Sequence, residues 1–188
     1  LCNQHSLNII LTGEYALKPP TPSEEILLRR IILIGHCDHV ARRMIPSKVT
    51  QAYGDNISRR RRLTAYQSCD AAVPQPLYIH PDSCLYRSDP DATLPEYLVY
   101  SGLQKSSRGD ITYMTCVTAI EGSWLAETSV DNGGSILQWG PPLLSPSPIY
   151  DSQNDCIMCY CIPYFGAHKW SLSPIKRPML EIMNSNSG

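Results

Sequence analysis

The stretch LPEYLVYSGLQKSSRGDITYMTCVTAI, residues 94–120, decides the fold that this sequence predicts. It contains two runs, 97–103 and 111–120, that are rich in Tyr, Val, Ile and Thr. Residues of these types favour β-strands, and the Ser, Gly and Asp residues between the two runs favour a turn. We therefore expect two strands in this stretch.

Three more strands are expected outside this stretch, at residues 63–68, 75–80 and 156–164. A short helix is expected at 121–128, before the last of them. Five strands with a helix before the last is the element order of an oligonucleotide/oligosaccharide-binding (OB) fold. The predicted fold class is mainly β with a leading helix, and its main domain is a five-stranded OB-fold-like barrel over residues 63–165.

The composition agrees with an ordinary folded domain. Of the 188 residues, 43% are hydrophobic and 18% are charged, which supplies enough apolar material for a core. The 16 prolines and 11 glycines favour many short elements over a helical bundle. The chain starts at Leu1 without a signal-like segment, and its longest aliphatic run, 31–34, is far too short to span a bilayer. We interpret the chain as a soluble intracellular fragment with no membrane partner.

A helix should precede the barrel, because Thr21-Pro22-Ser23-Glu24 has the residues of a capping box and a helix start. We expect this connecting helix to run from Pro22 to about Arg43, within residues 22–44, after the tail of a preceding domain at 1–21. Its apolar residues fall all round the helical wheel, which predicts burial against more than one neighbour. Gly35 costs about 1 kcal/mol relative to Ala in a helix, so close packing or a kink is expected there.

A basic segment is hidden in the formal net charge of −1. Between residues 42 and 62 there is one acid, Asp55, against seven basic residues: Arg42, Arg43, Lys48, Arg59, Arg60, Arg61 and Arg62. Such a stretch indicates a face that meets an anionic partner, and the alternative is a solvated loop. We expect residues 45–62 to form a basic loop.

The sequence has no Gly-x-x-x-x-Gly-Lys-Ser/Thr phosphate loop. We therefore expect no ATP hydrolysis by this chain alone, no catalytic residue and no cofactor in it.

The cysteines are better explained as buried thiols than as a metal site. Cys156, Cys159 and Cys161 precede His168, but structural zinc normally takes two ligand pairs. Strand alternation sends Cys156 to one face and Cys159 and Cys161 to the other. The eight cysteines of the chain are interpreted as reduced thiols, and no metal is expected.

His36-Cys37-Asp38-His39 resembles a catalytic cluster when it is written out. Successive residues of a helix point about 100° apart, so these side chains should diverge. Structural hydrogen bonding by Asp38 and His39 is favoured, and a nucleophilic enzyme using Cys37 or Cys159 remains the weaker alternative.

Four segments, taken in order and with their spacing, resemble the region after the ratchet domain of DEAH-box RNA helicases. They are LLRR through Gly35 to ARR (27–43), LYIHPDSCL (77–85), LPEYLVY (94–100) and YMTCVTAI continuing to Trp124 and Leu125 (113–125). The residues of this structural motif that we single out are Asp38, His39, Arg42, Arg43, His80, Pro81, Ser83, Tyr100 and Trp124. The resemblance implies the end of a ratchet domain followed by an OB-fold.

GHCDHVARR, residues 35–43, is similar to the segment found in the nucleolar helicases of small-subunit ribosome biogenesis. The tail from Cys156 to Pro174, which includes WSLSP at 170–174, is also similar to the C-terminal extension of that subgroup, and residues 166–188 are expected to form the C-terminal extension of this chain. The resemblance implies a nuclear, nucleolar protein of the small-subunit processome that releases small nucleolar RNA from pre-ribosomal RNA. It implies as partners single-stranded RNA (pre-rRNA or snoRNA), an activator protein and the motor domains of the same polypeptide, which would carry ATP and Mg²⁺.

The resemblance also implies which residues contact RNA. Phosphate contacts are expected from Arg59, Arg60, Arg61, Arg62, Lys105 and Arg108, with Ser106 and Ser107 as hydroxyl donors. Tyr66, Tyr78 and Tyr100 are candidates for stacking on bases, although core packing is favoured for each. Asp82 replaces a serine of the family motif, and an insertion follows Arg108, at residues 109–112.

Two alternatives remain open from the residues. The chain could be a helicase-derived adaptor barrel that binds protein partners without RNA or ATPase activity. The arginine run could also be solvated, with Arg108 paired to Asp110.

Overall fold

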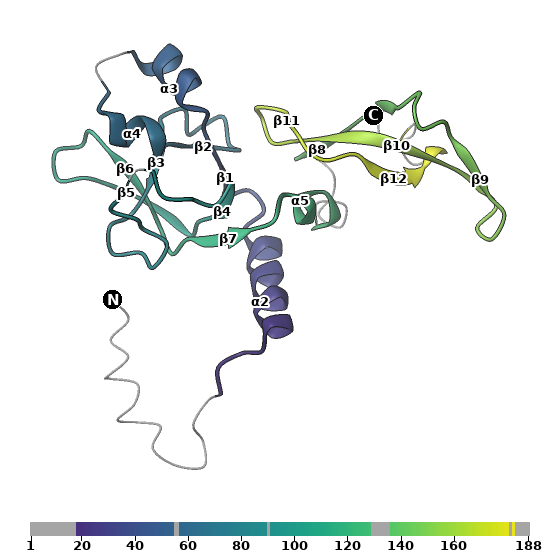
Figure 1. Ribbon diagram of the computed structural model, residues 1–188, viewed down its shortest axis with the longest axis horizontal. Helices are drawn as coiled ribbons and strands as arrows, with labels where there is room; N and C mark the ends of the chain where they lie inside the picture. Colours follow the sequence, from purple (N-terminus) through teal and green to yellow (C-terminus); the bar gives the residue numbers. More distant parts are fainter. Residues whose placement is uncertain (1–17, 55–56, 90, 129–135, 181, 183–188) are drawn as a thin grey trace.

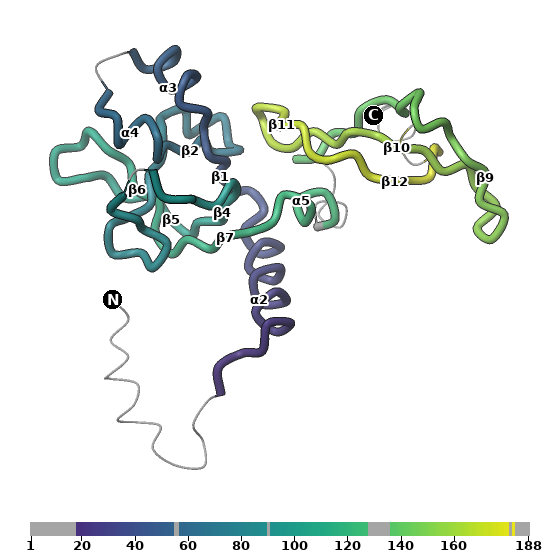
Figure 2. Tube along the Cα trace, viewed as in Figure 1, coloured from purple at the N-terminus to yellow at the C-terminus, as the bar shows by residue number. Residues whose placement is uncertain are grey.

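Two β-sheets and a projecting helix make up the computed structural model, which describes residues 18–54, 57–89, 91–128, 136–180 and 182. Figure 1 shows the first sheet curled beside helix α2 (Pro22–Gly35), and the second sheet extending away from it beyond helix α5 (Gly122–Thr128). The trace in Figure 2 passes through the first sheet, then α5 (Gly122–Thr128), and then the second sheet. No helix within the described ranges is long and apolar enough to cross a membrane.

Helix α2 (Pro22–Gly35) begins at the predicted capping box. The Thr21 backbone N–H donates to Glu24 Oε2 at 2.7 Å, and the Glu24 N–H donates to Thr21 Oγ1 at 3.3 Å. These reciprocal bonds satisfy free N–H groups of the first turn. They also hold the pKa of Glu24 below its ordinary value, because the Thr21 backbone and hydroxyl donate to its charged form.

The predicted extent of this helix is wrong at its C-terminal end. The helix ends at Gly35, where His36 has a φ of −136° and its N–H closes the last turn on Ile32 O and Leu33 O. Residues Val40–Arg43 form strand β1, which pairs with β2 (Tyr66–Ser68) on one side and β4 (Tyr97–Val99) on the other. Val40 and Ala41 are completely buried there, and this central position in the sheet outweighs the helical pattern of the flanking sequence.

The first sheet has the hydrogen-bonded order β5-β6-β3-β2-β1-β4-β7. Its remaining strands are β3 (Leu77–Ile79), β5 (Gly102–Lys105), β6 (Thr112–Thr115) and β7 (Thr118–Ile120). β4 and β5 follow each other directly in the chain, as do β6 and β7, so each pair is one of the predicted long strands with a break. The breaks lie opposite each other, since Val99 pairs with Thr118 and Gly102 with Thr115.

This broken hairpin explains how seven short strands make the expected five-stranded OB-like fold. One half of the hairpin, β4 and β7, pairs with β1 through β4. The other half, β5 and β6, pairs in parallel with β3 through β6. The two end strands of the hydrogen-bonded order, β5 and β7, therefore belong to the same hairpin. Cys116, with a φ of 48°, lies at the break between β6 and β7. Inside, the sheet buries a core made of Ala41, Tyr66, Leu77, Ile79, Leu94, Leu98, Tyr100 and Met114.

The strand predicted at 156–164 does not belong to this fold. It is β10 (Cys156–Phe165), the central strand of a second sheet, where it pairs with β8 (Leu137–Pro142), β9 (Ile149–Asp151), β11 (Trp170–Ser171) and β12 (Ile175–Pro178). These four strands pair along both edges of β10. In the first sheet, β1 takes the place of the strand that was expected at 156–164. The alternation of the cysteines is confirmed, because Cys159 and Cys161 are buried while Cys156 is partly exposed.

The two sheets meet at Gly166 and Cys69. Gly166 has a φ of +71°, and an added Cβ there would lie 2.8 Å from the Cys69 Cβ, so only glycine suits this close approach. The Ala167 N–H donates to Cys69 O at 2.9 Å, and the Trp170 indole N–H donates to Gln67 at 3.2 Å. Phe165, Trp170 and Leu172 join the core that Leu33, Val40 and Trp124 form on the other side.

The segment expected as a basic loop contains two short helices, α3 (Pro46–Tyr53) and α4 (Arg59–Leu63). Ser58 caps α4, because its side chain accepts a hydrogen bond from the Arg61 N–H at 3.4 Å. Arg60, Arg61 and Arg62 occupy the last turn of α4, where the negative end of the helix dipole favours cations.

Candidate nucleic-acid interface

The arginines of α4 make different contacts. The Arg59 guanidinium donates to both carboxylate oxygens of Asp91, at 2.8 and 2.9 Å. The Arg60 guanidinium lies 5.0 Å from the centre of the Tyr86 ring and donates to the Tyr86 hydroxyl and, at 3.3 Å, to the Arg87 carbonyl. Arg62 borders a shallow hollow with residues of α3.

The turn between β5 and β6 carries the other predicted phosphate contacts. The Ser106 hydroxyl donates to Asp110 Oδ1 at 2.8 Å, and the Ile111 N–H donates to Ser106 Oγ at 3.2 Å. Gly109 has a φ of +72°, which closes the turn with an N–H donated to Ser106 O at 2.8 Å. Ser106 therefore holds the shape of the turn. Lys105, Ser107 and Arg108 are exposed on it.

An ion pair joins this turn to α4. The Arg61 guanidinium donates to Asp110 Oδ2 at 2.7 Å, so the arginine run and the turn lie side by side although almost 50 residues separate them in sequence. The hydrogen bonds from Arg61 and Ser106 hold the pKa of Asp110 below its ordinary value. The pairing of Arg108 with Asp110, which was the alternative, does not occur. Within the described residues Arg108 has no hydrogen-bond or ion-pair partner.

A pocket of about 210 Å³ opens beside this ion pair. Its wall is aromatic at Tyr78, Tyr86 and Tyr113, and cationic at Arg60, Arg61 and Arg87. Tyr78 is only 8% exposed, and burial raises the pKa of its hydroxyl, so the hydroxyl stays protonated at neutral pH. Of the three tyrosines considered for base stacking, Tyr66 and Tyr100 are in the core, and Tyr78 lines this pocket.

The motif residues at 80–83 shape one side of this pocket. The Asp82 N–H donates to His80 Nδ1 at 3.2 Å, and the His80 ring meets the Tyr113 ring edge-on, with 5.3 Å between ring centres. Pro81 lines the pocket directly. Ser83 accepts from the Leu85 N–H at 3.2 Å, which fixes the turn that leads to Tyr86. The motif thus positions the pocket wall.

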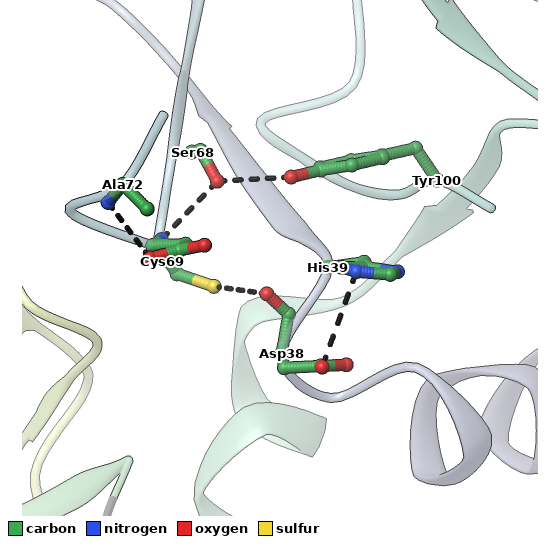
Figure 3. A network of polar contacts seen from close by, with 7 residues as sticks. Asp38, His39, Ser68, Cys69, Ala72 and Tyr100 are labelled. Carbon is green, nitrogen blue, oxygen red and sulfur yellow. Dashed lines mark hydrogen bonds and ion pairs between the residues drawn. The ribbon is translucent and has the colours of Figure 1, made fainter. Parts of the chain in front are cut away.

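Asp38 and His39 have structural roles at the junction between α2 and β1 (Figure 3). The Cys69 thiol donates to Asp38 O at 3.1 Å, and the His39 ring stacks on Tyr100 with 5.2 Å between ring centres. Ser68 and Tyr100 share a buried hydroxyl–hydroxyl hydrogen bond of 3.0 Å. Burial raises the pKa of the Cys69 thiol to about 11, which keeps this network free of a reactive thiolate.

Arg42, Arg43 and Trp124 also hold the fold together. Arg42 pairs with Glu96 at 2.9 Å and lies 5.3 Å from the centre of the Tyr97 ring. Arg43 donates to Leu63 O at 3.3 Å. Trp124 is 6% exposed and lies beneath Arg29 and Arg30.

The cysteines that were considered for zinc lie outside any group of metal ligands among the described residues. In the described part of the chain, no three His, Cys, Asp or Glu side chains are grouped to hold a metal. Cys159 is 1% exposed, and burial raises the pKa of its thiol, which disfavours the thiolate form that a nucleophile needs.

Sequence reasoning missed Tyr86, Arg87 and Tyr113 as site residues. Tyr86 and Arg87 directly follow the segment 77–85, and Tyr113 opens the segment 113–125, so all three were within reach of the motif. The signal that could have found them is the adjacency of aromatic and cationic residues, Tyr86 to Arg87, at the end of a turn.

Comparisons with known proteins agree with the fold of the first sheet. A family model described as an oligonucleotide/oligosaccharide-binding (OB)-fold matches residues 28–130. The chain is 33% identical over 129 residues to the ATP-dependent RNA helicase DEAH13 of Arabidopsis thaliana, covering 69% of this chain and 9% of that protein. It is 28% identical over 160 residues to the probable ATP-dependent RNA helicase DHX37 of Homo sapiens, covering 85% and 12%.

A further relative is the probable ATP-dependent RNA helicase kurz of Drosophila melanogaster, 29% identical over 195 residues, covering 96% of this chain and 14% of that protein. The chain thus spans about a tenth of the length of these curated relatives. A solved structure, the E. coli DExH-box NTPase HrpB, is similar over 85% of this chain and 15% of its own, with a TM-score of 0.38 and 13% identity.

Proposed function

We propose, from the premise that this chain belongs to the OB-fold family that forms the C-terminal domain of DEAH-box RNA helicases, that it is the RNA-contacting and partner-docking portion of such an enzyme. The parent protein would be an ATP-dependent helicase whose motor domains bind ATP and Mg²⁺. It would act in the nucleolus, in small ribosomal subunit biogenesis, by releasing snoRNA from pre-rRNA.

The observation that carries this proposal is the Arg61–Asp110 pair of 2.7 Å, which joins the two basic segments into one surface. Arg61 and Asp110 are 38% and 45% exposed, and Arg59 and Asp91 are 64% and 56% exposed. Such exposed pairs contribute little to stability, so an RNA phosphate can replace the carboxylate at little cost. Arg62, Lys105 and Arg108 add cations that carry no ion pair within the described residues.

The assignment to ribosome biogenesis rests on the segment GHCDHVARR (35–43). In this fold Asp38 and His39 form the junction between α2 and β1, so the segment fixes where the leading helix sits against the barrel. Helicases that share this junction would attach their preceding domains to the barrel in the same orientation. The similarity of this segment to that of the nucleolar helicases therefore supports a role in ribosome biogenesis.

Ultraviolet crosslinking in cells that express the full-length protein tests the proposal. We expect pre-rRNA and snoRNA fragments to be recovered, with crosslinked peptides from α4 and from the turn between β5 and β6. Recovery of unrelated RNAs would contradict the ribosomal role. Crosslinks confined to the motor domains would contradict RNA contact by this barrel.

A second candidate is the helicase-derived adaptor that binds protein partners without RNA or ATPase activity. The observation that favours it is that Arg59 and Arg61 are already paired with acids, which lowers the charge available to RNA. An adaptor would give protein crosslinks at this surface and no RNA.

A further inference from the structure

The pocket beside α4 differs from the rest of the basic surface because it is a hollow with a mainly apolar wall. Ile79, Pro81, Leu94 and Ile111 line it together with the three tyrosines Tyr78, Tyr86 and Tyr113. An apolar and aromatic wall with a few polar groups is the usual lining of a site for an organic ligand. Phosphate contact alone would not need such a wall.

The charge of the pocket selects the kind of ligand. Arg60, Arg61 and Arg87 border it, and none of the described residues that line it is an aspartate or a glutamate. The acids Asp91 and Asp110 hold arginines from outside the lining. The pocket therefore suits a group that is aromatic and attached to an anion, and it disfavours a cation.

The size of the pocket limits the ligand to one small ring system. Its volume of about 210 Å³ is below the roughly 300–1,000 Å³ of pockets for drug-sized ligands. A whole nucleotide with its phosphates would not be enclosed. A single base would be, with its phosphates outside on the arginines.

A stacking surface is already arranged there. The Arg60 guanidinium lies 5.0 Å from the centre of the Tyr86 ring and is held by the Arg87 carbonyl at 3.3 Å. Guanidinium planes and tyrosine rings are the groups on which proteins stack unpaired bases of single-stranded RNA. The Tyr113 ring is fixed in turn by its edge-on contact with His80.

We propose that this pocket holds one unstacked base of a single RNA strand, in contact with Tyr86 and Tyr113, while Arg87 and the α4 arginines bind the neighbouring phosphates. This rests on the proposed RNA contact and makes it more specific. The surface then has two functions: the exposed arginines follow the backbone, and the pocket fixes the position of one nucleotide. A phosphotyrosine peptide has similar chemistry and is the ligand that the test must separate from RNA.

The first test compares the Tyr86→Leu variant with the wild-type chain, with Tyr150→Leu on the second sheet as the matched control. We expect Tyr86→Leu to bind single-stranded RNA about 5- to 150-fold more weakly, the range for the loss of one stacked base. The salt dependence of binding should stay unchanged, because no phosphate contact is removed. Tyr150 is 60% exposed and far from the pocket lining, so its replacement should change nothing.

Abasic RNA and a fluorescent base give readouts that do not depend on a variant. Wild-type protein should bind an oligonucleotide without bases as weakly as Tyr86→Leu binds the intact one. Binding of a 2-aminopurine oligonucleotide should quench its fluorescence, as stacking on an aromatic side chain does. RNA that binds with no quenching and no preference for intact bases would overturn the pocket while leaving the proposed RNA contact in place.

Absence of any RNA binding would instead overturn the proposed function itself. A phosphotyrosine peptide that binds the wild type but not Tyr86→Leu, and that RNA fails to displace, would assign the pocket to a protein partner and overturn the RNA base.

Discussion

Helices α2 and α4 border the same barrel and present opposite chemistry to their surroundings. α2 exposes six aliphatic side chains, with exposed fractions between 38% and 57%: Ile26, Leu27, Leu28, Ile31, Ile32 and Ile34. α4 consists of four arginines and Leu63. An apolar patch of this kind marks a surface for another protein part, whereas clustered arginines fit a polyanion. Under the proposed function, we expect α2 to contact another protein part and α4 to contact RNA.

The attachment of α2 to the barrel explains why its aliphatic residues remain exposed. Arg29 and Arg30 lie 5.2 and 5.1 Å from the centre of the Trp124 ring, and Arg29 donates to Ala119 O at 2.7 Å. Leu33 is the buried residue of the helix. The arginines and Leu33 hold one side of α2, and the aliphatic side is left for a neighbour. We expect that neighbour in the preceding part of the same polypeptide.

The largest effect is expected for Trp124→Ala. Removing a buried tryptophan from a core costs about 3–5 kcal/mol of unfolding free energy. Here it also removes the ring beneath Arg29 and Arg30, so α2 should separate from the barrel. Chemical denaturation measures the loss, and Trp139→Ala, at a half-buried tryptophan of the second sheet, is the control that should lose less. Equal losses would mean that α2 is held by something else.

Two substitutions within α2 sharpen the comparison of its two sides. Leu33→Ala should cost about 2–5 kcal/mol, because Leu33 is fully buried. Ile31→Ala, at a residue that is 55% exposed, should stay within about 0.5 kcal/mol of the wild type. The free energy of unfolding measures both. A large cost for Ile31→Ala in the isolated chain would show that the aliphatic side is already covered.

On the other side, replacing Arg59, Arg60, Arg61 and Arg62 together by alanine should weaken binding to every single-stranded RNA. The slope of log affinity against log salt should fall by more than the roughly 0.7 that one phosphate contact contributes. Fluorescence anisotropy at several salt concentrations measures it. If affinity and slope stay those of the wild type, the run is a solvated helix and the adaptor function gains support.

Asp110→Asn should have the opposite effect on RNA binding. It removes the carboxylate that competes with an RNA phosphate for Arg61, so the variant should bind single-stranded RNA more tightly than the wild type does. Weaker binding by this variant would show that the ion pair is needed to hold the turn in place.

Low pH should weaken the ion pair between Arg61 and Asp110. The pKa of Asp110 is lowered in the folded protein, so the pair stabilises the fold above the ordinary carboxyl pKa. This contribution is lost as the pH falls through the lower folded value. A pH titration of Asp110 by NMR should therefore give a pKa below the ordinary value in the wild type, and a higher one in Arg61→Ala.

The parts of the fold with strong local signals were predictable from sequence. The capping box at Thr21 and Glu24 is confirmed, as are strands within 97–103 and 111–120. Strand β1 was missed, because Val40–Arg43 is short and its strand character comes from its neighbours β2 and β4. The strand at 156–164 was placed in the wrong sheet, since alternation reveals a strand but not its partners.

The site was predictable only in part. The arginine run and the turn at 105–108 were identified from charge and resemblance, and their contact through Arg61 and Asp110 could not be, because it joins distant segments. The same holds for the pocket, whose residues come from α4, β3, the turn after Pro81 and β6. Tyr66 and Tyr100 are the opposite case: their residue type made them candidates for stacking on a base, but both are buried in the core.

The most direct test of the central claim is the salt dependence of RNA binding by Arg108→Ala. Arg108 is exposed on the turn beside α4 and free of ion pairs with the described residues, so its replacement removes a charge without breaking the fold. Lys169→Ala, which removes an exposed charge between β10 and β11, is the matched control. If the turn contacts RNA, Arg108→Ala lowers the slope of log affinity against log salt by about 0.7, equally for all sequences, and Lys169→Ala leaves it unchanged. A slope for Arg108→Ala equal to that of the wild type would contradict the account.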